Sequence, residues 1–205
     1  MNGVLNIFKP KGMSSFDAVR VVKKVAGTGK IGHTGTLDPE ATGVLPICIG
    51  KATKIIDYIM DSEKVYEVTL KLGIRTTTYD LEGEVLEERD PSHLTEEEIL
   101  NAINSFKGEY SQIPPMYSAL KQNGVRLYEL ARKGIEVERK GRLVNIYNLE
   151  DIKINNPYIS MKVTCSKGTY IRSLCYDIGE KLGVFATMTQ LNRAKTSVFS
   201  QEKSI

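Results

Sequence analysis

The stretch from residue 32 to residue 43 reads Gly-His-Thr-Gly-Thr-Leu-Asp-Pro-Glu-Ala-Thr-Gly, and it constrains the fold more than any other part of the chain. Because proline biases the preceding residue toward an extended backbone, Asp38 is kept out of any helix. The three glycines allow sharp bends and a close approach of the backbone to a ligand. The residues alone favour an Asp-Pro turn capped by its own carboxylate. The alternative is an acid presented to a bound molecule among short side chains.

Composition excludes several classes of protein. The chain has 205 residues, 41% of them hydrophobic, which suits one large domain or two small ones with a sizeable core. Apolar runs are only a few residues long, so no segment is expected to span a bilayer. The first residues are typical of a core strand rather than of a charged and then apolar leader, which argues against export. We therefore expect a cytoplasmic protein.

Cysteine, histidine and glycine spacing predicts no metal or nucleotide site. The three cysteines are odd in number and lack metal-type spacing, so buried thiols are expected at Cys48, Cys165 and Cys175. The two histidines, His33 and His93, lie far apart in the sequence, and no zinc site is expected. Residues 27–32 match a dinucleotide-binding glycine pattern, but they follow a predicted helix and lead into a turn, whereas that pattern needs a strand and then a helix.

The net charge of +3 hides an asymmetry between segments. Residues 80–98 hold nine acids and one base, so the remainder of the chain carries a net charge of +11. Such an excess attracts a polyanion if the bases share a face, and scattered solubilising charge is the alternative. Residues 121–142 hold seven bases and three acids, with Tyr117 and Tyr128 nearby. Bases interleaved with aromatic rings suit phosphate binding and base stacking, and a solvated basic loop is the alternative.

Hydrophobic periodicity predicts an α+β fold around a mixed, mostly antiparallel sheet with flanking helices. Residues 64–72 alternate most clearly, with Tyr66 on the apolar face, and Ser14 with Asp17 is typical of a helix start. Helices are expected over 16–26, 51–60, from 95, over 127–132 and over 169–182. Strands are expected over 4–8, 45–49, 64–72, 84–88, 144–154, 158–165, 188–192 and 197–199. Arg172 lies in the first turn of its helix and opposes the helix dipole, so we expect an anionic partner, either Asp38 or a phosphate.

Further blocks follow the 32–43 stretch in a fixed order: VLP at 44–46, GKATK at 50–54, KVY at 64–66, DLEG at 80–83, PPMYSA at 114–119, GTYIRSL at 168–174 and LNR at 191–193. Together they resemble the signature of the TruB family of pseudouridine synthases, and they cover nearly the whole chain. The resemblance implies the pseudouridine synthase fold with a central active-site cleft. It also implies isomerisation of the T-loop uridine at position 55 of tRNA to pseudouridine, a reaction that requires no cofactor.

The resemblance implies roles for single residues. Asp38 is the catalytic carboxylate, which attacks the base or the sugar carbon or helps to remove a ribose proton. Arg172 favours the charged form of Asp38. Tyr66 stacks on the uracil and takes part in removing the proton from C5. Leu191 packs against the base. His33 enters the space that the flipped-out uridine leaves, and a turn histidine bonded to the main chain is the alternative.

The resemblance also implies contacts with RNA. Residues 107–142 resemble an insertion that closes over the T-arm stem-loop. Lys64, Lys121 and Arg126 are expected to contact the RNA backbone, while Asp80 lines the pocket or caps a turn. The expected partner is tRNA, bound by a monomer without a membrane or a nucleotide cofactor.

One departure from the family pattern affects the domain organisation. Bacterial members usually continue into a small C-terminal RNA-binding domain of the PUA type. We expect residues 1–205 to be a catalytic domain without a complete PUA domain, which puts affinity for the tRNA acceptor end in doubt. Three other functions stay open. One is an RNA-guided pseudouridine synthase subunit that acts on ribosomal RNA, and another is a non-catalytic tRNA binder or folding chaperone. The third is a base methyltransferase or glycosylase, which would need a cofactor site or would release free uracil.

Overall fold

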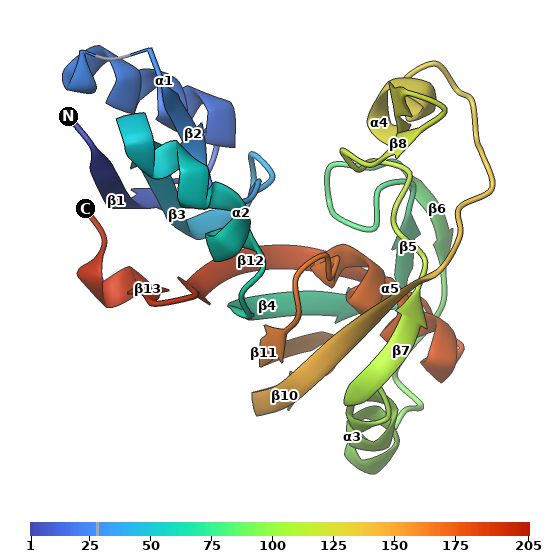
Figure 1. The fold of residues 1–205 in the computed structure, drawn as a ribbon. Coiled ribbons are helices and arrows are strands. Elements are labelled where there is room, and N and C mark those ends of the chain that lie inside the picture. The colour runs from blue at the N-terminus through green and yellow to red at the C-terminus, as the bar shows by residue number, and fades with distance from the viewer. Residues whose placement is uncertain (28) are drawn as a thin grey trace. The chain divides into compact units, whose positions relative to one another are not determined.

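The structure, a computed structural model, describes residues 1–27 and 29–205 and has the predicted α+β fold (Figure 1). The chain forms two compact units. Unit 1 comprises residues 1–68, 162–167 and 190–205, and unit 2 comprises residues 69–161 and 168–189. The strands with residues in both units are β4 (Lys64–Leu72), β11 (Tyr158–Cys165) and β12 (Ala186–Thr196).

The remaining elements lie in one unit each. In unit 1 they are β1 (Gly3–Lys9), α1 (Ser15–Ala26), β2 (Ile31–His33), β3 (Thr42–Ile49), the 3₁₀ helix η1 (Gly50–Ile55), α2 (Ile56–Met60), β13 (Phe199–Ser200) and the 3₁₀ helix η2 (Gln201–Lys203). In unit 2 they are β5 (Ile74–Thr76), β6 (Val85–Glu88), α3 (Glu96–Asn104), β7 (Gly108–Gln112), β8 (Lys121–Gln122), β9 (Val125–Arg126), α4 (Leu127–Ala131), β10 (Arg142–Asn155) and α5 (Ile171–Leu182).

The main sheet is mixed and mostly antiparallel, as predicted. Its strand order in the described part of the chain is β1-β3-β12-β4-β11-β10-β7. β1 runs antiparallel to β3, from Gly3 opposite Ile49 to Lys9 opposite Gly43. β12 runs parallel to β3, with Arg193 opposite Gly43. Gly43, which ends the 32–43 stretch, therefore lies in the middle one of three neighbouring strands, between β1 and β12.

Helix α1 begins and ends where the sequence predicts. The Ser14 side chain accepts a hydrogen bond from the Asp17 amide at 3.1 Å, and the Asp17 carboxylate accepts from the Ser14 amide at 3.2 Å, which completes a capping box. Gly27 ends the helix with φ 61°, a left-handed conformation that suits glycine. The buried side of α1 packs into the same hydrophobic core as β3.

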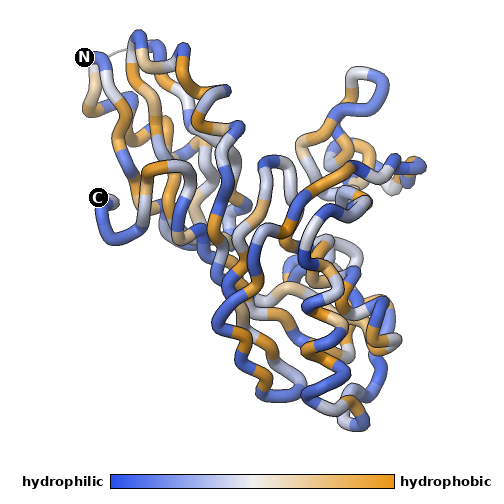
Figure 2. Tube along the Cα trace, turned by 60° about the horizontal axis from the view of Figure 1, so that its bottom comes forward, coloured by the Kyte–Doolittle hydropathy of each residue, from blue (hydrophilic) through white to orange (hydrophobic). Residues whose placement is uncertain are grey.

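Apolar positions that the sequence predicts are buried in strand β11 and helix α5. In β11, alternate residues from Ile159 to Cys165 are buried, and hydrophobic and hydrophilic positions alternate along the traced strands (Figure 2). In α5 the predicted seam is buried at Ile171, Leu174, Cys175 and Ile178. Cys48 and Cys165 are buried as well, which confirms the expected thiols.

Within residues 1–27 and 29–205, every helix is too short or too polar to cross a bilayer.

Three predicted elements differ clearly from the structure. Of the predicted 197–199 strand only Phe199 lies in a strand, because residues 197 and 198 form the turn between β12 and β13. Only residues 56–60 of the predicted 51–60 helix are α-helical, and η1 replaces the rest. The Thr53 hydroxyl donates to the Gly50 carbonyl at 2.8 Å, a local bond of the kind that competes with α-helical pairing. The predicted 188–192 strand is part of β12, which runs from Ala186 to Thr196 and pairs at its end with β13.

Asp177 on α5 gives unit 2 a pH-dependent stability. Burial, and then the Glu180 carboxylate, raise the pKa of Asp177 to about 7, while a hydrogen bond from Tyr110 acts in the opposite direction. An aspartate in an unfolded chain has a pKa of about 4. Between these values the unfolded state releases a proton that the folded state keeps. The free energy of unfolding therefore falls as the pH rises through this window.

Asp177→Asn should remove that slope. We expect the urea midpoint of the wild type to fall between about pH 4.5 and pH 7.5, and that of the variant to stay closer to constant. Asp57→Asn, which changes an exposed acid on α2, is the control and should keep the wild-type slope. An unchanged slope in Asp177→Asn would contradict the assignment.

Candidate active site

The loop that carries Asp38 is held at the residues on either side of it. The Leu37 amide donates to the Ser15 side-chain oxygen at 2.8 Å, and that hydroxyl donates to the Leu37 carbonyl at 3.0 Å. The Pro39 carbonyl accepts from the Gly12 amide at 2.9 Å. Asp38 itself is half-buried. The backbone therefore presents the Asp38 side chain from a fixed position.

Lys9 supports the same loop from β1. Its ammonium is fully buried and donates to three carbonyl oxygens, that of Pro39 among them at 3.2 Å. Burial lowers the pKa of Lys9, and the carboxylates of Asp38 and Glu40 act in the opposite direction. Lys9 therefore both fixes the loop and places a positive charge within electrostatic range of Asp38.

Arg193 of β12 is another buried cation of unit 1, with 1% of its surface exposed. Its Nε donates to the Val44 carbonyl at 2.8 Å, and its Nη2 donates to the Gly35 carbonyl at 3.1 Å. A planar guanidinium with five donors can serve several fixed acceptors at once. Arg193 therefore joins β3 to the glycine-rich loop.

Tyr66 and Leu191 lie beside the Asp38 loop. Both are half-buried and pack against the hydrophobic core of unit 1, to which Leu37 and Ala41 of the loop also belong. Burial raises the pKa of the Tyr66 phenol, and the charge and hydrogen bond of Arg193 oppose this, while the Asp38 carboxylate adds a smaller increase. The Tyr66 phenol is therefore neutral at pH 7, and Asp38 is close enough to act on it.

His33 ends β2, next to the glycine-rich turn. Its Nδ1 accepts a hydrogen bond from the Gly35 amide at 3.3 Å. Burial and the charge of Arg193 lower the pKa of His33, although the Gly35 contact acts in the opposite direction. The ring is therefore neutral at pH 7 and carries its proton on Nε2. This main-chain contact matches the turn-histidine alternative.

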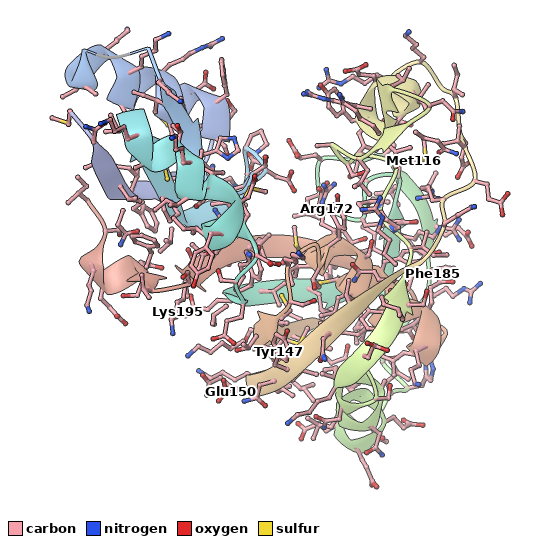
Figure 3. All side chains as sticks on the ribbon, viewed as in Figure 1. Met116, Tyr147, Glu150, Arg172, Phe185 and Lys195 are labelled. Atoms are coloured by element: carbon pink, nitrogen blue, oxygen red, sulfur yellow. The ribbon has the colours of Figure 1, made fainter. Side chains whose placement is uncertain are left out.

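Arg172 is the second residue of α5 and has its described contacts in unit 2 (Figure 3). The side chain is 7% exposed and forms an ion pair with Asp80, with 3.2 Å between Nη1 and Oδ2. It also donates to the Thr78 carbonyl at 3.2 Å and to the Tyr117 carbonyl at 2.8 Å. Asp80 is thus an anionic partner of Arg172, which the sequence analysis did not consider. The predicted pairing of Arg172 with Asp38 stays a prediction, because the two residues belong to different units.

Asp80 also orders the turn that holds it. Its Oδ1 accepts from the Glu82 amide at 3.0 Å and from the Thr78 hydroxyl. The neighbouring Tyr79 has a positive φ of 65° and stacks on Tyr176 of α5, with 4.1 Å between ring centroids. Because Tyr176 lies one turn after Arg172, the same helix holds both sides of the ion pair.

The three predicted RNA contacts differ in exposure. Lys64 is buried, and its ammonium donates to the carbonyls of Met60 and Ser62. Lys121 and Arg126 are exposed and directly opposite each other in the β8–β9 hairpin. The turn between them is Asn123-Gly124, both with positive φ, as two-residue hairpins favour. The structure therefore brings Lys121 and Arg126 together, and the RNA contacts of all three residues stay predictions.

Comparison with known families covers almost the whole chain. Residues 23–171 match the TruB family pseudouridylate synthase N-terminal domain, and residues 172–205 match the tRNA pseudouridylate synthase B C-terminal domain. The chain belongs to the TruB family. This confirms the resemblance drawn from the sequence blocks.

The TruB-family chain is most informatively compared with two bacterial relatives. It is 67% identical over 206 residues to the tRNA pseudouridine synthase B of Clostridium perfringens strain ATCC 13124, covering 100% of this chain and 70% of the relative. It is 64% identical over 205 residues to that of Clostridium tetani strain Massachusetts, covering 100% of this chain and 71% of the relative.

Solved structures show the same fold as this TruB-family chain. A chain in the crystal structure of a Cbf5-Nop10-Gar1 complex is 32% identical, with a TM-score of 0.75 over 97% of this chain and 50% of that one. This chain therefore spans half the length of that protein. A pseudouridylate synthase structure at 17% identity has a TM-score of 0.51 over 100% of this chain and 67% of that one, and it supports the fold alone.

Sequence reasoning missed the two buried cations of the TruB site in unit 1. Charged side chains are expected at the surface, so the sequence gives no reason to place Lys9 and Arg193 in the core, where the structure buries both. A signal was present for Arg193, because it ends the Leu-Asn-Arg block from which only Leu191 was assigned a role.

Gly43→Ala should destabilise unit 1 strongly. Gly43 has φ +116°, and a Cβ there would lie 2.3 Å from the Arg193 carbonyl oxygen and 2.5 Å from its amide nitrogen. We expect a loss of at least about 2 kcal/mol in the free energy of unfolding, measured by urea denaturation. Gly12→Ala is the control, because Gly12 has φ +79° and nothing within 4 Å of the added Cβ. Equal losses in the two variants would show that the backbone contact has no effect.

Proposed function

We propose that this chain isomerises the T-loop uridine at position 55 of tRNA to pseudouridine. The observation that carries the proposal is the anchored loop that presents Asp38, with Tyr66 packed against the core to which that loop belongs. The name tRNA pseudouridine synthase B, which relatives at 64–67% identity carry, supports tRNA as the substrate. We assign the T-arm stem-loop as the recognised part of the tRNA, and a monomer in the cytoplasm as the working form.

The reaction rearranges one nucleoside without an external reactant. The bond between ribose C1′ and uracil N1 breaks, the base turns, and a bond between C1′ and C5 forms. C5 then loses its proton and N1 gains one. The protein therefore needs a nucleophile or an anionic stabiliser, a group that takes the C5 proton, and a surface that holds the detached base.

Asp38 supplies the carboxylate in this proposal. In a covalent route it attacks the base or C1′, and in a glycal-type route it helps to remove a ribose proton. Both routes need a carboxylate held in one place, which the Ser15 and Lys9 contacts to its flanking residues provide. The Tyr66 phenol stacks on the uracil and takes part in removing the C5 proton, and Leu191 packs against the base.

Access to the uridine requires extrusion from the T-loop, at a cost of roughly a few kcal/mol. We assign His33 to the space that the uridine leaves, because its neutral ring can stack there without carrying a charge into the base pairs. Residues 107–142 close over the stem-loop, and Lys121 and Arg126 of this segment contact the RNA backbone. Lys64 is assigned as a further contact to the RNA backbone, and Asp80 is assigned to the pocket. Residues 1–205 act as the catalytic domain.

The RNA-guided alternative rests on the similarity to the Cbf5 chain. Its identity of 32% is about half that to tRNA pseudouridine synthase B. Conversion of a bare tRNA transcript by this chain alone would exclude a requirement for a guide. Retention of the cellular role by Asp38→Ala would favour the tRNA-binding or folding-chaperone alternative.

Asp38→Asn should abolish pseudouridine formation in a T-arm stem-loop RNA. An amide of the same size fits the loop but lacks the nucleophilic charge, so we expect a loss of at least about a thousandfold with RNA affinity largely retained. The measurements are chemical mapping of pseudouridine and filter binding. Glu40→Gln, which changes the exposed acid paired with Lys11, is the control and should stay active. Conversion of uridine by Asp38→Asn would show that the site is assigned wrongly.

Arg172→Lys should also slow turnover. A lysine ammonium cannot reproduce a planar fork that serves Asp80, Thr78 and Tyr117 together. We expect roughly a 10- to 100-fold loss in the single-turnover rate. Arg20→Lys is the control, because Arg20 is an exposed partner of Asp17 on α1. If both variants react at the wild-type rate, Arg172 has no role that depends on its shape.

A further inference from the structure

The N-terminus of α5 is held by a side chain from another element. Tyr170 is the N-cap residue of α5 and its own side chain caps nothing. Gln112, the last residue of β7, is 1% exposed and bonds both main-chain groups of Tyr170. The Tyr170 amide donates to Oε1 at 2.8 Å, and Nε2 donates to the Tyr170 carbonyl at 3.1 Å.

The chemistry of these partners fixes the orientation of the Gln112 amide. A backbone amide can only donate and a carbonyl can only accept, so Oε1 must face the first and Nε2 the second. The second hydrogen of Nε2 reaches the Tyr110 hydroxyl. That hydroxyl accepts this hydrogen, and a hydrogen bond from Tyr110 also lowers the pKa of Asp177, two turns along the same helix. Each polar group of the buried Gln112 amide therefore has a partner. No other natural side chain of this length offers both the acceptor and the donor that Tyr170 needs.

A second bond attaches the same strand end to α5. The Ser173 hydroxyl, which is buried, donates to the Ile113 carbonyl at 2.8 Å. Gln112 and Ile113 thus hold Tyr170 and Ser173, the residues that flank the first turn on both sides of Arg172. The Tyr170 carbonyl also accepts the helical bond from Leu174 at 3.1 Å.

We propose that Gln112 is a positioning residue that sets the place of the Arg172 guanidinium by clamping Tyr170 at the start of α5. Arg172 reaches Asp80, Thr78 and Tyr117 from its first-turn backbone, so a shift of that turn moves the guanidinium away from all three. This inference rests on the proposed function, in which Arg172 serves the reaction. Displacements of about 1 Å at such a group cost up to about a hundredfold in rate.

The test compares Gln112→Leu and Gln112→Glu with the wild type in single-turnover assays on a T-arm stem-loop RNA. Leucine removes both bonds to Tyr170, whereas glutamate keeps the acceptor and loses the donor, so it serves if the leucine variant fails to fold. We expect the rate to fall at least about tenfold and the RNA dissociation constant to change less than about threefold. Ile103→Val, which shortens a buried side chain of α3 beside α5, controls for a general loss of stability.

Two further measurements separate positioning from mere stability. Gln112→Leu combined with Arg172→Lys should lose no more than the worse single variant, because both changes disable one group. Hydrogen exchange at the Leu174 amide should be faster in Gln112→Leu than in Ile103→Val. Losses that multiply in the double variant, or a Gln112→Leu rate equal to that of Ile103→Val, would overturn the inference. An inactive wild type would instead overturn the proposed function.

Discussion

The arrangement of unit 1 depends on one buried guanidinium. Arg193 donates to Val44 in β3 and to Gly35 in the glycine-rich loop. Its backbone lies so close to Gly43 that no side chain fits between them. A substitution at Arg193 would therefore leave two carbonyl groups without their partner in the core, and such groups are costly to bury. Strand β3 and the loop that carries Asp38 share this point of attachment.

The buried cations of unit 1 donate to carbonyl oxygens. Lys9 donates to three carbonyls, Lys64 to two, and Arg193 to two. Carbonyl dipoles solvate a buried charge without neutralising it, whereas a carboxylate would cancel it. Unit 1 thus keeps positive charge beneath the Asp38 loop. That charge favours an anion at the surface of the loop, whether it is a carboxylate of the protein or a phosphate of the RNA.

Local patterns predicted the elements better than they predicted the site. The capping box of α1 and the alternation of β4 depend on neighbours in sequence, and both were read correctly. The anionic partner of Arg172 was not, because Asp80 is 92 residues away and only the fold brings them together. The clamp on Tyr170 was hidden for the same reason, since Gln112 is a common polar residue at the end of a strand. Lys9 and Arg193 were missed because charged residues are expected at the surface, whereas both are buried.

The β8–β9 hairpin places two like charges side by side at an exposed tip. Lys121 and Arg126 are cross-strand neighbours, and like charges in that position repel. Arg126 is also held by Tyr128, whose hydroxyl accepts from Nη1 at 3.0 Å. Under the proposed function, an RNA phosphate placed between the two side chains would offset the repulsion. Binding of RNA would then also stabilise the hairpin that contacts it.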